Sequence, residues 1–212
     1  MQPAIIIGLG AIGAAAAWFA LRRNSASNAL PAGTLPTSNP FATPLAAKSG
    51  IGNEWDQLIS LVASREGVDP ALLKAIVKKE SGFDEEAVNP ERSFFLYGKS
   101  YGPGDLSGRR ALHDFIAGGG DPASIGLNPS LGLAQVRVSI GKKFIPGLDA
   151  IQLFDPQTNL TASARLLRQL AKAGITLDTI DAYNVGQDLS PRNLPYRDEV
   201  RANYALFVPD FQ

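Results

Sequence analysis

The stretch Leu72–Pro90, "LLKAIVKKESGFDEEAVNP", combines an apolar helix face with one carboxylate. Four apolar residues recur there at the spacing of a buried helix face: Leu72, Leu73, Ile76 and Val77. Glu80 falls four residues after Ile76, so the same helix turns its carboxyl group onto this stripe. Burial and the negative end of a helix both favour a protonated carboxyl group, so we predict a raised pKa at Glu80. A glutamate that simply turns outward to solvent is the alternative.

The composition excludes several classes of protein. The chain has 212 residues and a formal net charge of zero, so it has no basic excess with which to bind nucleic acid. It has no cysteine, which excludes disulfides, thiolate chemistry and cysteine zinc sites. A single histidine, His113, rules out a multi-histidine metal site and argues against a serine–histidine triad. We therefore expect no metal, no cofactor and no nucleic-acid partner.

An uncharged segment opens the chain. Residues 3–21 read "PAIIIGLGAIGAAAAWFAL", and Arg22 and Arg23 close this run. At the rise of an α-helix it would extend roughly 28 Å, close to the thickness of a bilayer core. We predict a transmembrane anchor over residues 1–23. A secretory signal peptide is the main alternative, but the run lacks a preceding basic region and a convincing cleavage site; a buried helix is the other.

A flexible linker is expected over residues 24–50, which are rich in Pro, Ser and Thr and carry one charge. Residues 51–212 are expected to form one mainly α domain, because no alternating strand pattern of useful length occurs. Capping residues and apolar periodicity predict helices over residues 53–67, 69–81, 107–116, 155–173, 177–185 and 196–207.

Several motifs follow one another in a recognisable order. They are "GVDPALLKAIVKKESGF" (67–83), "SLGLAQV" (130–136), "FDPQTNLTASARLLRQL" (154–170), "DAYNVG" (181–186) and "LPYRDEVRANY" (194–204). Together they resemble the soluble lytic transglycosylases, a family with a goose-type lysozyme fold. Ala134 stands where that family usually has methionine. The resemblance implies a mainly α, lysozyme-like transglycosylase domain that acts on the glycan strands of peptidoglycan.

The resemblance also implies a chemistry for Glu80. This residue would protonate the oxygen between MurNAc and GlcNAc and then act as a base, while the C6 hydroxyl of MurNAc attacks C1 to give 1,6-anhydro-MurNAc. No obvious second carboxylate shares the pocket, because Asp84, Glu85 and Glu86 fall just past the helix end. The N-acetyl group of the substrate can serve as the nucleophile instead.

Eight further residues match the motifs and are candidates for substrate binding: Ser81, Ser130, Gly132, Leu133, Gln135, Tyr183, Asn184 and Tyr196. Ser81 would help to position the carboxyl group of Glu80, or it is only a small residue at a helix end. Tyr183 and Asn184 would bound the acid's pocket, where a tyrosine hydroxyl can hold the carboxyl group and an amide can hold an acetamido group. Tyr196 would complete the site, or it merely packs in the core.

The sequence departs from the family pattern over residues 89–128. This inserted lobe separates Glu80 from Gln135 and carries several aromatic and basic residues. They suit stacking on sugars and pairing with peptide carboxylates, or they form a small satellite core. We expect the lobe to flank the cleft.

Two other functions remain open at this point. The chain could hydrolyse the same bond, as a goose-type lysozyme does, or it could be a non-catalytic, membrane-anchored structural protein of a virion. The expected location is a single-pass anchor, through residues 3–21, in a bacterial envelope facing the periplasm or in the membrane of a phage particle. The sequence indicates neither the oligomeric state nor the orientation of the anchor.

Overall fold

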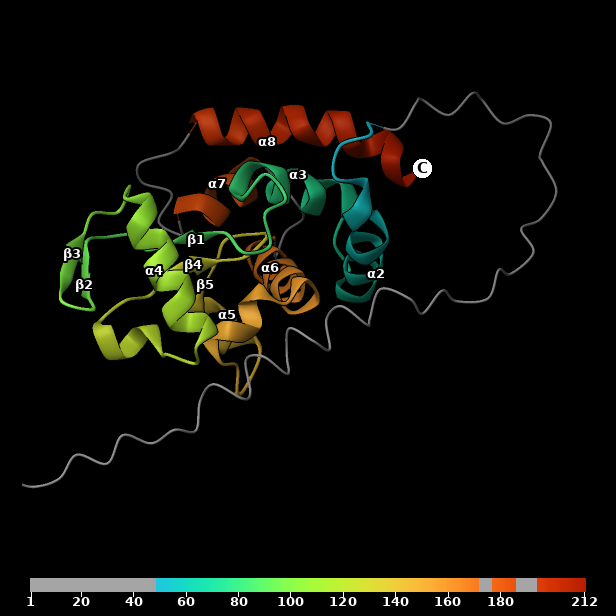
Figure 1. The fold of residues 1–212 in the computed structure, drawn as a ribbon. Helices are drawn as coiled ribbons and strands as arrows, with labels where there is room; N and C mark the ends of the chain where they lie inside the picture. Colours follow the sequence, from blue (N-terminus) through green and yellow to red (C-terminus); the bar gives the residue numbers. More distant parts are fainter. Residues whose placement is uncertain (1–48, 172–176, 186–193) are drawn as a thin grey trace, which may run out of the picture.

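The computed structural model describes residues 49–171, 177–185 and 194–212 (Figure 1). The predicted anchor and most of the predicted linker lie outside these ranges. Within the ranges that are described, no helix has the length and apolar character needed to cross a membrane.

The described chain is mainly helical, which confirms the predicted fold class. Its α-helices are α2 (Asp56–Glu66), α3 (Pro70–Glu80), α4 (Leu106–Ala117), α5 (Val138–Phe144), α6 (Pro156–Leu170), α7 (Leu177–Val185) and α8 (Leu194–Phe207). Short 3₁₀ turns occupy Asn53–Trp55, Pro122–Ile125, Ala150–Phe154 and Val208–Phe211. Helix α5 is not among the predicted helices.

The helix boundaries follow from capping chemistry. Gly67 ends α2 in the left-handed conformation (φ 69°). Asp69 caps α3 by accepting two backbone N–H groups of the first turn, and Pro70 fills the first helical position. The cap of α4 differs from the predicted Ser107: Asp105 is the cap, and both the N–H and the hydroxyl of Ser107 donate to its carboxylate.

Two small β structures join the helices. A three-stranded antiparallel sheet has the order β1 (Val88–Asn89), β4 (Ser130–Leu131), β5 (Val136–Arg137). A separate hairpin consists of β2 (Phe94–Leu96) and β3 (Lys99–Tyr101). The register pairs Ser130 with Asn89 on one side and with Arg137 on the other, so the three residues lie side by side. Strands this short leave no readable alternation in a sequence.

Helix α3 is the central helix of the domain. Each of its residues from Ala71 to Val77 is buried, and α8 lies along it in Figure 1, with α2 and α6 on its other sides. The apolar stripe that the sequence predicted therefore faces the core. Glu80 is the last residue of α3 and is only partly buried, so it lies at the edge of the core rather than in its middle.

One of the buried residues of α3 is a lysine. The side chain of Lys74 is fully buried, and its Nζ lies 2.6 Å from a carboxylate oxygen of Asp56 and 2.6 Å from one of Asp210. The ring of Phe207 lies 4.7 Å from the same ammonium group. Asp210 also accepts hydrogen bonds from the N–H and the hydroxyl of Ser49, each 2.7 Å long. Ser49, which the sequence placed inside the linker, thus contacts the domain.

Residues 89–128 contain the hairpin, helix α4 and one 3₁₀ turn. Phe94 is buried and its ring stacks on that of Tyr101, with centroids 5.2 Å apart. Leu112 and Ile116 of α4 are also fully buried in the core. The hairpin tip is different: Tyr97 is 70% exposed and touches Phe115 edge to face. Most of the aromatic residues of this lobe therefore pack inward.

Candidate active site

Glu80 is the last residue of α3 and faces a cleft. Burial raises the pKa of its carboxyl group from 4.5 to about 7. The hydroxyl of Tyr196, on α8, donates a 2.6 Å hydrogen bond to the carboxyl group and lowers its pKa in part. The nearby charges act in opposite directions, since Glu91 raises this pKa and Lys79 lowers it. The direction agrees with the prediction, and burial is its main cause.

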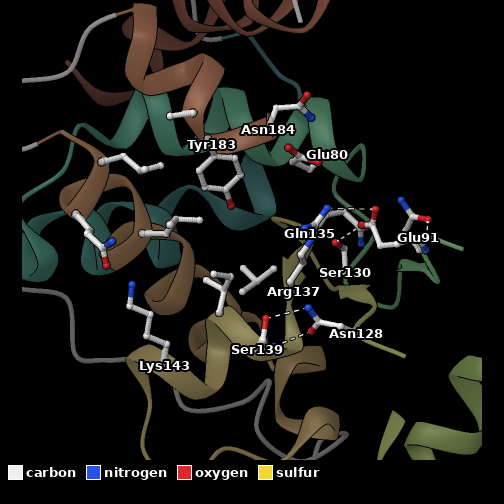
Figure 2. A pocket seen from close by; sticks show the side chains of 17 residues that line it. Glu80, Glu91, Asn128, Ser130, Gln135, Arg137, Ser139, Lys143, Tyr183 and Asn184 are labelled. Atoms are coloured by element: carbon white, nitrogen blue, oxygen red, sulfur yellow. Dashed lines mark hydrogen bonds and ion pairs between the residues drawn. The ribbon is translucent and has the colours of Figure 1, made fainter. Parts of the chain in front are cut away.

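The cleft has a volume of about 430 Å³ and lies between the end of α3, the small sheet and helices α5, α6 and α7 (Figure 2). Five of the predicted site residues line it: Glu80, Ser130, Gln135, Tyr183 and Asn184. Four others do not: Ser81, Gly132, Leu133 and Tyr196. These four instead contact Glu80 or help to hold the end of α3 and the turn that follows β4.

The turn between β4 and β5 forms one wall. Gly132 has a φ of 71°, and a Cβ there would lie 2.3 Å from the carbonyl oxygen of Leu153. Only glycine fits such a close approach. Gln135 also has a positive φ, of 46°. Its side-chain Nε2 donates to the carbonyl oxygens of Ala87 and Gly132, each at 3.1 Å. The turn thereby holds Gln135 against the cleft.

Asn159 of α6 fixes this turn, and the sequence analysis did not identify it. The side chain is fully buried. Its Oδ1 accepts the N–H of Ala134 at 2.8 Å, and its Nδ2 donates to the carbonyl oxygens of Leu131 at 2.7 Å and Leu153 at 2.9 Å. In the sequence, Asn159 could have been recognised as a buried polar residue because it precedes Leu160, the first residue of the apolar stripe of α6.

Two side chains contact other partners than those expected. The hydroxyl of Tyr183 donates to the carbonyl oxygen of Ala134 at 2.9 Å and lies 2.8 Å from the hydroxyl of Ser163. The hydroxyl of Tyr183 therefore does not hold the carboxyl group of Glu80. The hydroxyl of Tyr196 holds it instead. The hydroxyl of Ser81 donates to the carbonyl oxygen of Leu133 at 2.7 Å, so it joins the end of α3 to the turn rather than contacting the acid.

A second carboxylate lines the cleft, contrary to the expectation that none does. Glu91 lies just after β1, and its Oε1 accepts a 2.5 Å hydrogen bond from the hydroxyl of Ser130. A guanidinium nitrogen of Arg137 lies 3.6 Å from the other oxygen. Glu91 belongs to the lobe of residues 89–128, and Asn89 and Asn128 line the cleft as well. Both ends of this lobe therefore contribute to the site.

Comparison with protein-family models identifies the family of this chain. The family model of the transglycosylase SLT domain matches residues 57–204. A solved structure of an inactive mutant of the lytic transglycosylase Slt from Pseudomonas aeruginosa matches with a TM-score of 0.44 and 18% identity, over 74% of this chain and 22% of that chain. The chain thus spans less than a quarter of the length of that enzyme. Curated proteins give no significant match. Because the family model covers well over half of the sequence, this chain belongs to the transglycosylase SLT domain family, which confirms the predicted family.

Proposed function

We propose that this chain cleaves the β-1,4 bond between MurNAc and GlcNAc in peptidoglycan and releases 1,6-anhydro-MurNAc ends. The observation that carries the proposal is the state of Glu80. Its carboxyl group lines an open cleft with a pKa of about 7, and the hydroxyl of Tyr196 fixes its orientation. Near neutral pH such a group can give up a proton and then take one back.

Glu80 performs both proton transfers in this reaction. As an acid it protonates the glycosidic oxygen, and the bond between C1 of MurNAc and that oxygen breaks. The N-acetyl group of the same sugar attacks C1 and stabilises the developing positive charge. The C6 oxygen of MurNAc then attacks C1 and displaces the N-acetyl group. The Glu80 carboxylate removes the proton of this C6 hydroxyl in the same step. No water is consumed, and Glu80 ends protonated as it began.

The other cleft residues bind the sugars. Asn184 and Gln135 present amide groups to the cleft, and an amide can pair with an acetamido group. Because the Nε2 of Gln135 already donates to two backbone carbonyls, Gln135 would use its Oε1 to accept the acetamido N–H. Ser130 lies on the sheet side of the same cleft. Ser81, Gly132, Leu133 and Tyr183 support these residues through the contacts that hold the turn and the end of α3 together.

Hydrolysis is the second candidate, and Glu91 is the observation that favours it. Many glycoside hydrolases use two carboxylates, one as the acid and one to activate water. Glu91 provides a second carboxylate in the cleft that holds Glu80. In this alternative the products carry reducing MurNAc ends instead of anhydro ends.

One digest separates these functions. Purified sacculi are incubated with the protein, and the released muropeptides are analysed by mass spectrometry. We expect anhydro ends, and a loss of roughly 10²-fold or more in Glu80→Gln, the range typical of a missing general acid. Glu86→Gln is the matched control, because Glu86 is exposed and does not line the cleft. Reducing ends would establish the hydrolase. Full activity of Glu80→Gln would exclude Glu80 as the acid, and a wild-type protein that releases no muropeptides would favour the non-catalytic structural protein.

We further propose that residues 3–21 anchor the enzyme in a membrane beside its substrate, in a bacterial envelope or a phage particle. The support is the uncharged length of this segment and the location of peptidoglycan outside the cytoplasmic membrane. Deletion of residues 1–23 should leave a soluble protein that still cleaves sacculi. A truncated protein that does not fold would contradict the anchor.

A further inference from the structure

Glu91 occupies an unusual backbone conformation at the edge of the cleft. Its φ is 66°, in the left-handed region that residues other than glycine rarely adopt. Its own N–H donates to Oδ1 of Asn89 at 3.1 Å, which closes a tight turn directly after β1. Such conformations cost free energy and persist where the surrounding structure holds them, often at functional sites. Here the turn directs the side chain of Glu91 into the cleft (Figure 2).

The sheet holds the carboxylate of Glu91 from two sides. Ser130 and Arg137 are paired neighbours on β4 and β5, and both contact it, at 2.5 Å through the serine hydroxyl and at 3.6 Å through the guanidinium group. A hydroxyl donor and a guanidinium group thus hold this carboxylate in one position. The side chain stays 32% exposed, and Glu91 lines the cleft. Glu91 is therefore a fixed anion on the cleft wall.

The groups that face Glu80 come from several elements. Tyr196 on α8 donates to it. Burial raises the pKa of the Tyr183 hydroxyl on α7, and the nearby charge of Glu80 raises it further. Lys79, the neighbour of Glu80 on α3, is engaged by Glu199 of α8 at 2.5 Å. On the sheet side, Glu91 is the anion that lines the same cleft, together with its partner Arg137 and with Lys143 of α5.

We propose that Glu91 is a positioning residue of this enzyme, a fixed anion that acts through Glu80 and keeps the proton on it until substrate is bound. The inference rests on the proposed function, since it assigns a role within the same site. The two carboxylates then divide the work: Glu91 is held in place by a serine hydroxyl and a guanidinium group, and Glu80, buried at the same cleft, carries the proton. Separate environments for two acids are a general means of assigning such roles.

The test is the isosteric variant Glu91→Gln, read out first without substrate. The Glu80 carboxyl resonance is titrated by ¹³C NMR in protein labelled at glutamate, and the Glu80→Gln spectrum assigns it. Removing the anion should lower the pKa of Glu80 by several tenths of a unit to about one unit, as expected for the loss of a nearby like charge. Glu91→Asp retains the charge and should restore most of the wild-type pKa. Glu86→Gln, which removes an exposed charge from the same segment, should leave this pKa unchanged.

The pH profile of cleavage gives the second readout. Because Glu80 must be protonated to act as the acid, the alkaline limb of the Glu91→Gln profile should move to lower pH. Activity should fall about three- to tenfold at about pH 8, in proportion to the lost protonated fraction, and stay close to wild type near pH 5. An unchanged titration of Glu80 in Glu91→Gln overturns the proposal, and so does an equal loss at every pH.

The two proposals fail in different ways. If the wild-type protein releases no anhydro ends, the proposed function fails, while the NMR titration still measures whether Glu91 and Glu80 are coupled. If cleavage proceeds but Glu91→Asp behaves like Glu91→Gln in both readouts, the charge is not the cause, and the role of Glu91 is overturned alone.

Discussion

The proton on Glu80 links the active site to the stability of the domain. The pKa of this glutamate is about 7 in the folded protein against an ordinary value of 4.5, so the folded state binds the proton more tightly than the unfolded state. The stabilisation is fully present below about pH 4.5 and is lost as the pH rises through about 7. A difference of this size corresponds to roughly 3 kcal/mol.

Glu80→Gln should therefore make the protein more stable while it removes the acid. Glutamine keeps the shape and cannot ionise, so at about pH 8 the free energy of unfolding should rise by roughly 1 to 3 kcal/mol. At about pH 4, where both states of the wild type are largely protonated, the gain should vanish. Urea unfolding at the two pH values measures this. Equal stability of the variant and the wild type at about pH 8 would contradict the burial of Glu80.

Tyr196 should act on the pKa of Glu80 in the opposite direction to Glu91. Its hydroxyl stabilises the ionised carboxylate, so Tyr196→Phe should raise the pKa of Glu80 above about 7. Cleavage should also fall about tenfold, because the carboxyl group loses the hydrogen bond that orients it.

Tyr204→Phe is the control for Tyr196→Phe, since it removes another hydroxyl of α8, one that donates to Asp69 at the start of α3. A wild-type titration of Glu80 in Tyr196→Phe would show that this hydrogen bond does not hold the acid.

At the scale of elements, the turn between β4 and β5 depends on a helix that follows it in the chain. Asn159 of α6 accepts one hydrogen bond, from the N–H of Ala134, and donates two, to the carbonyl oxygens of Leu131 and Leu153. All of these groups lie inside the core, so no solvent can replace the amide if it is lost. The position of Gln135 in the cleft is thus set by α6.

Asn159→Ala should destabilise the domain by roughly 2 to 5 kcal/mol, because it leaves three backbone groups without partners in the core. Cleavage by the remaining folded protein should fall as well, since Gln135 loses its support. Gln157→Ala on the same helix changes an exposed side chain and should have little effect. Thermal denaturation and the sacculus digest measure the two effects. If Asn159→Ala and Gln157→Ala have the same melting temperature, the hydrogen bonds of Asn159 do not stabilise the turn.

The elements that could be predicted from the sequence are the helices with clear capping residues or with an apolar pattern that repeats over several turns. Helix α3 begins at Pro70 as expected because Asp69 and Pro70 are both strong start signals. Strands β1, β4 and β5 were not predicted, since two residues carry no alternation. The choice of Ser107 as a cap was wrong because a carboxylate two residues earlier competes for the same N–H groups.

The site was predictable as far as its motifs reach. The motifs indicated Glu80, Gln135 and Asn184, which line one cleft. They did not indicate which tyrosine hydroxyl reaches the acid, because that depends on how α7 and α8 pack against α3. Glu91 gave no signal at all, since it lies in a loop of irregular conformation whose direction only the sheet pairing sets.

On the scale of the whole molecule, Lys74 joins segments from both ends of the described domain. Lys74 is a residue of α3. Its ammonium group contacts Asp56 at the start of α2 and Asp210 in the last 3₁₀ turn. Buried ion pairs are costly to form, yet removing one partner leaves an unpaired charge in the core. This network therefore fixes how the two ends pack rather than adding much stability.

Lys74→Met should destabilise the domain by roughly 3 to 5 kcal/mol, because two carboxylates lose their cation. The triple variant Lys74→Met, Asp56→Asn, Asp210→Asn removes the charges together and should recover much of this loss. Chemical denaturation of the two variants and the wild type measures the difference. If the single and triple variants are equally unstable, the charge of Lys74 is not what the core requires.

The hydrogen bonds between Ser49 and Asp210 bring the two ends of the described domain to one point. Because these two ends meet, a short connector could join them, and the chain could begin and end at another exposed position without changing the fold. A circular permutant that joins Gln212 to Ser49 through a short glycine-rich connector, and opens between Tyr97 and Gly98 at the exposed hairpin tip, should fold and keep the cleft intact. If this permutant releases muropeptides as fast as the linear chain, the order of the motifs along the chain is not needed for activity. Their positions in the folded domain are then sufficient.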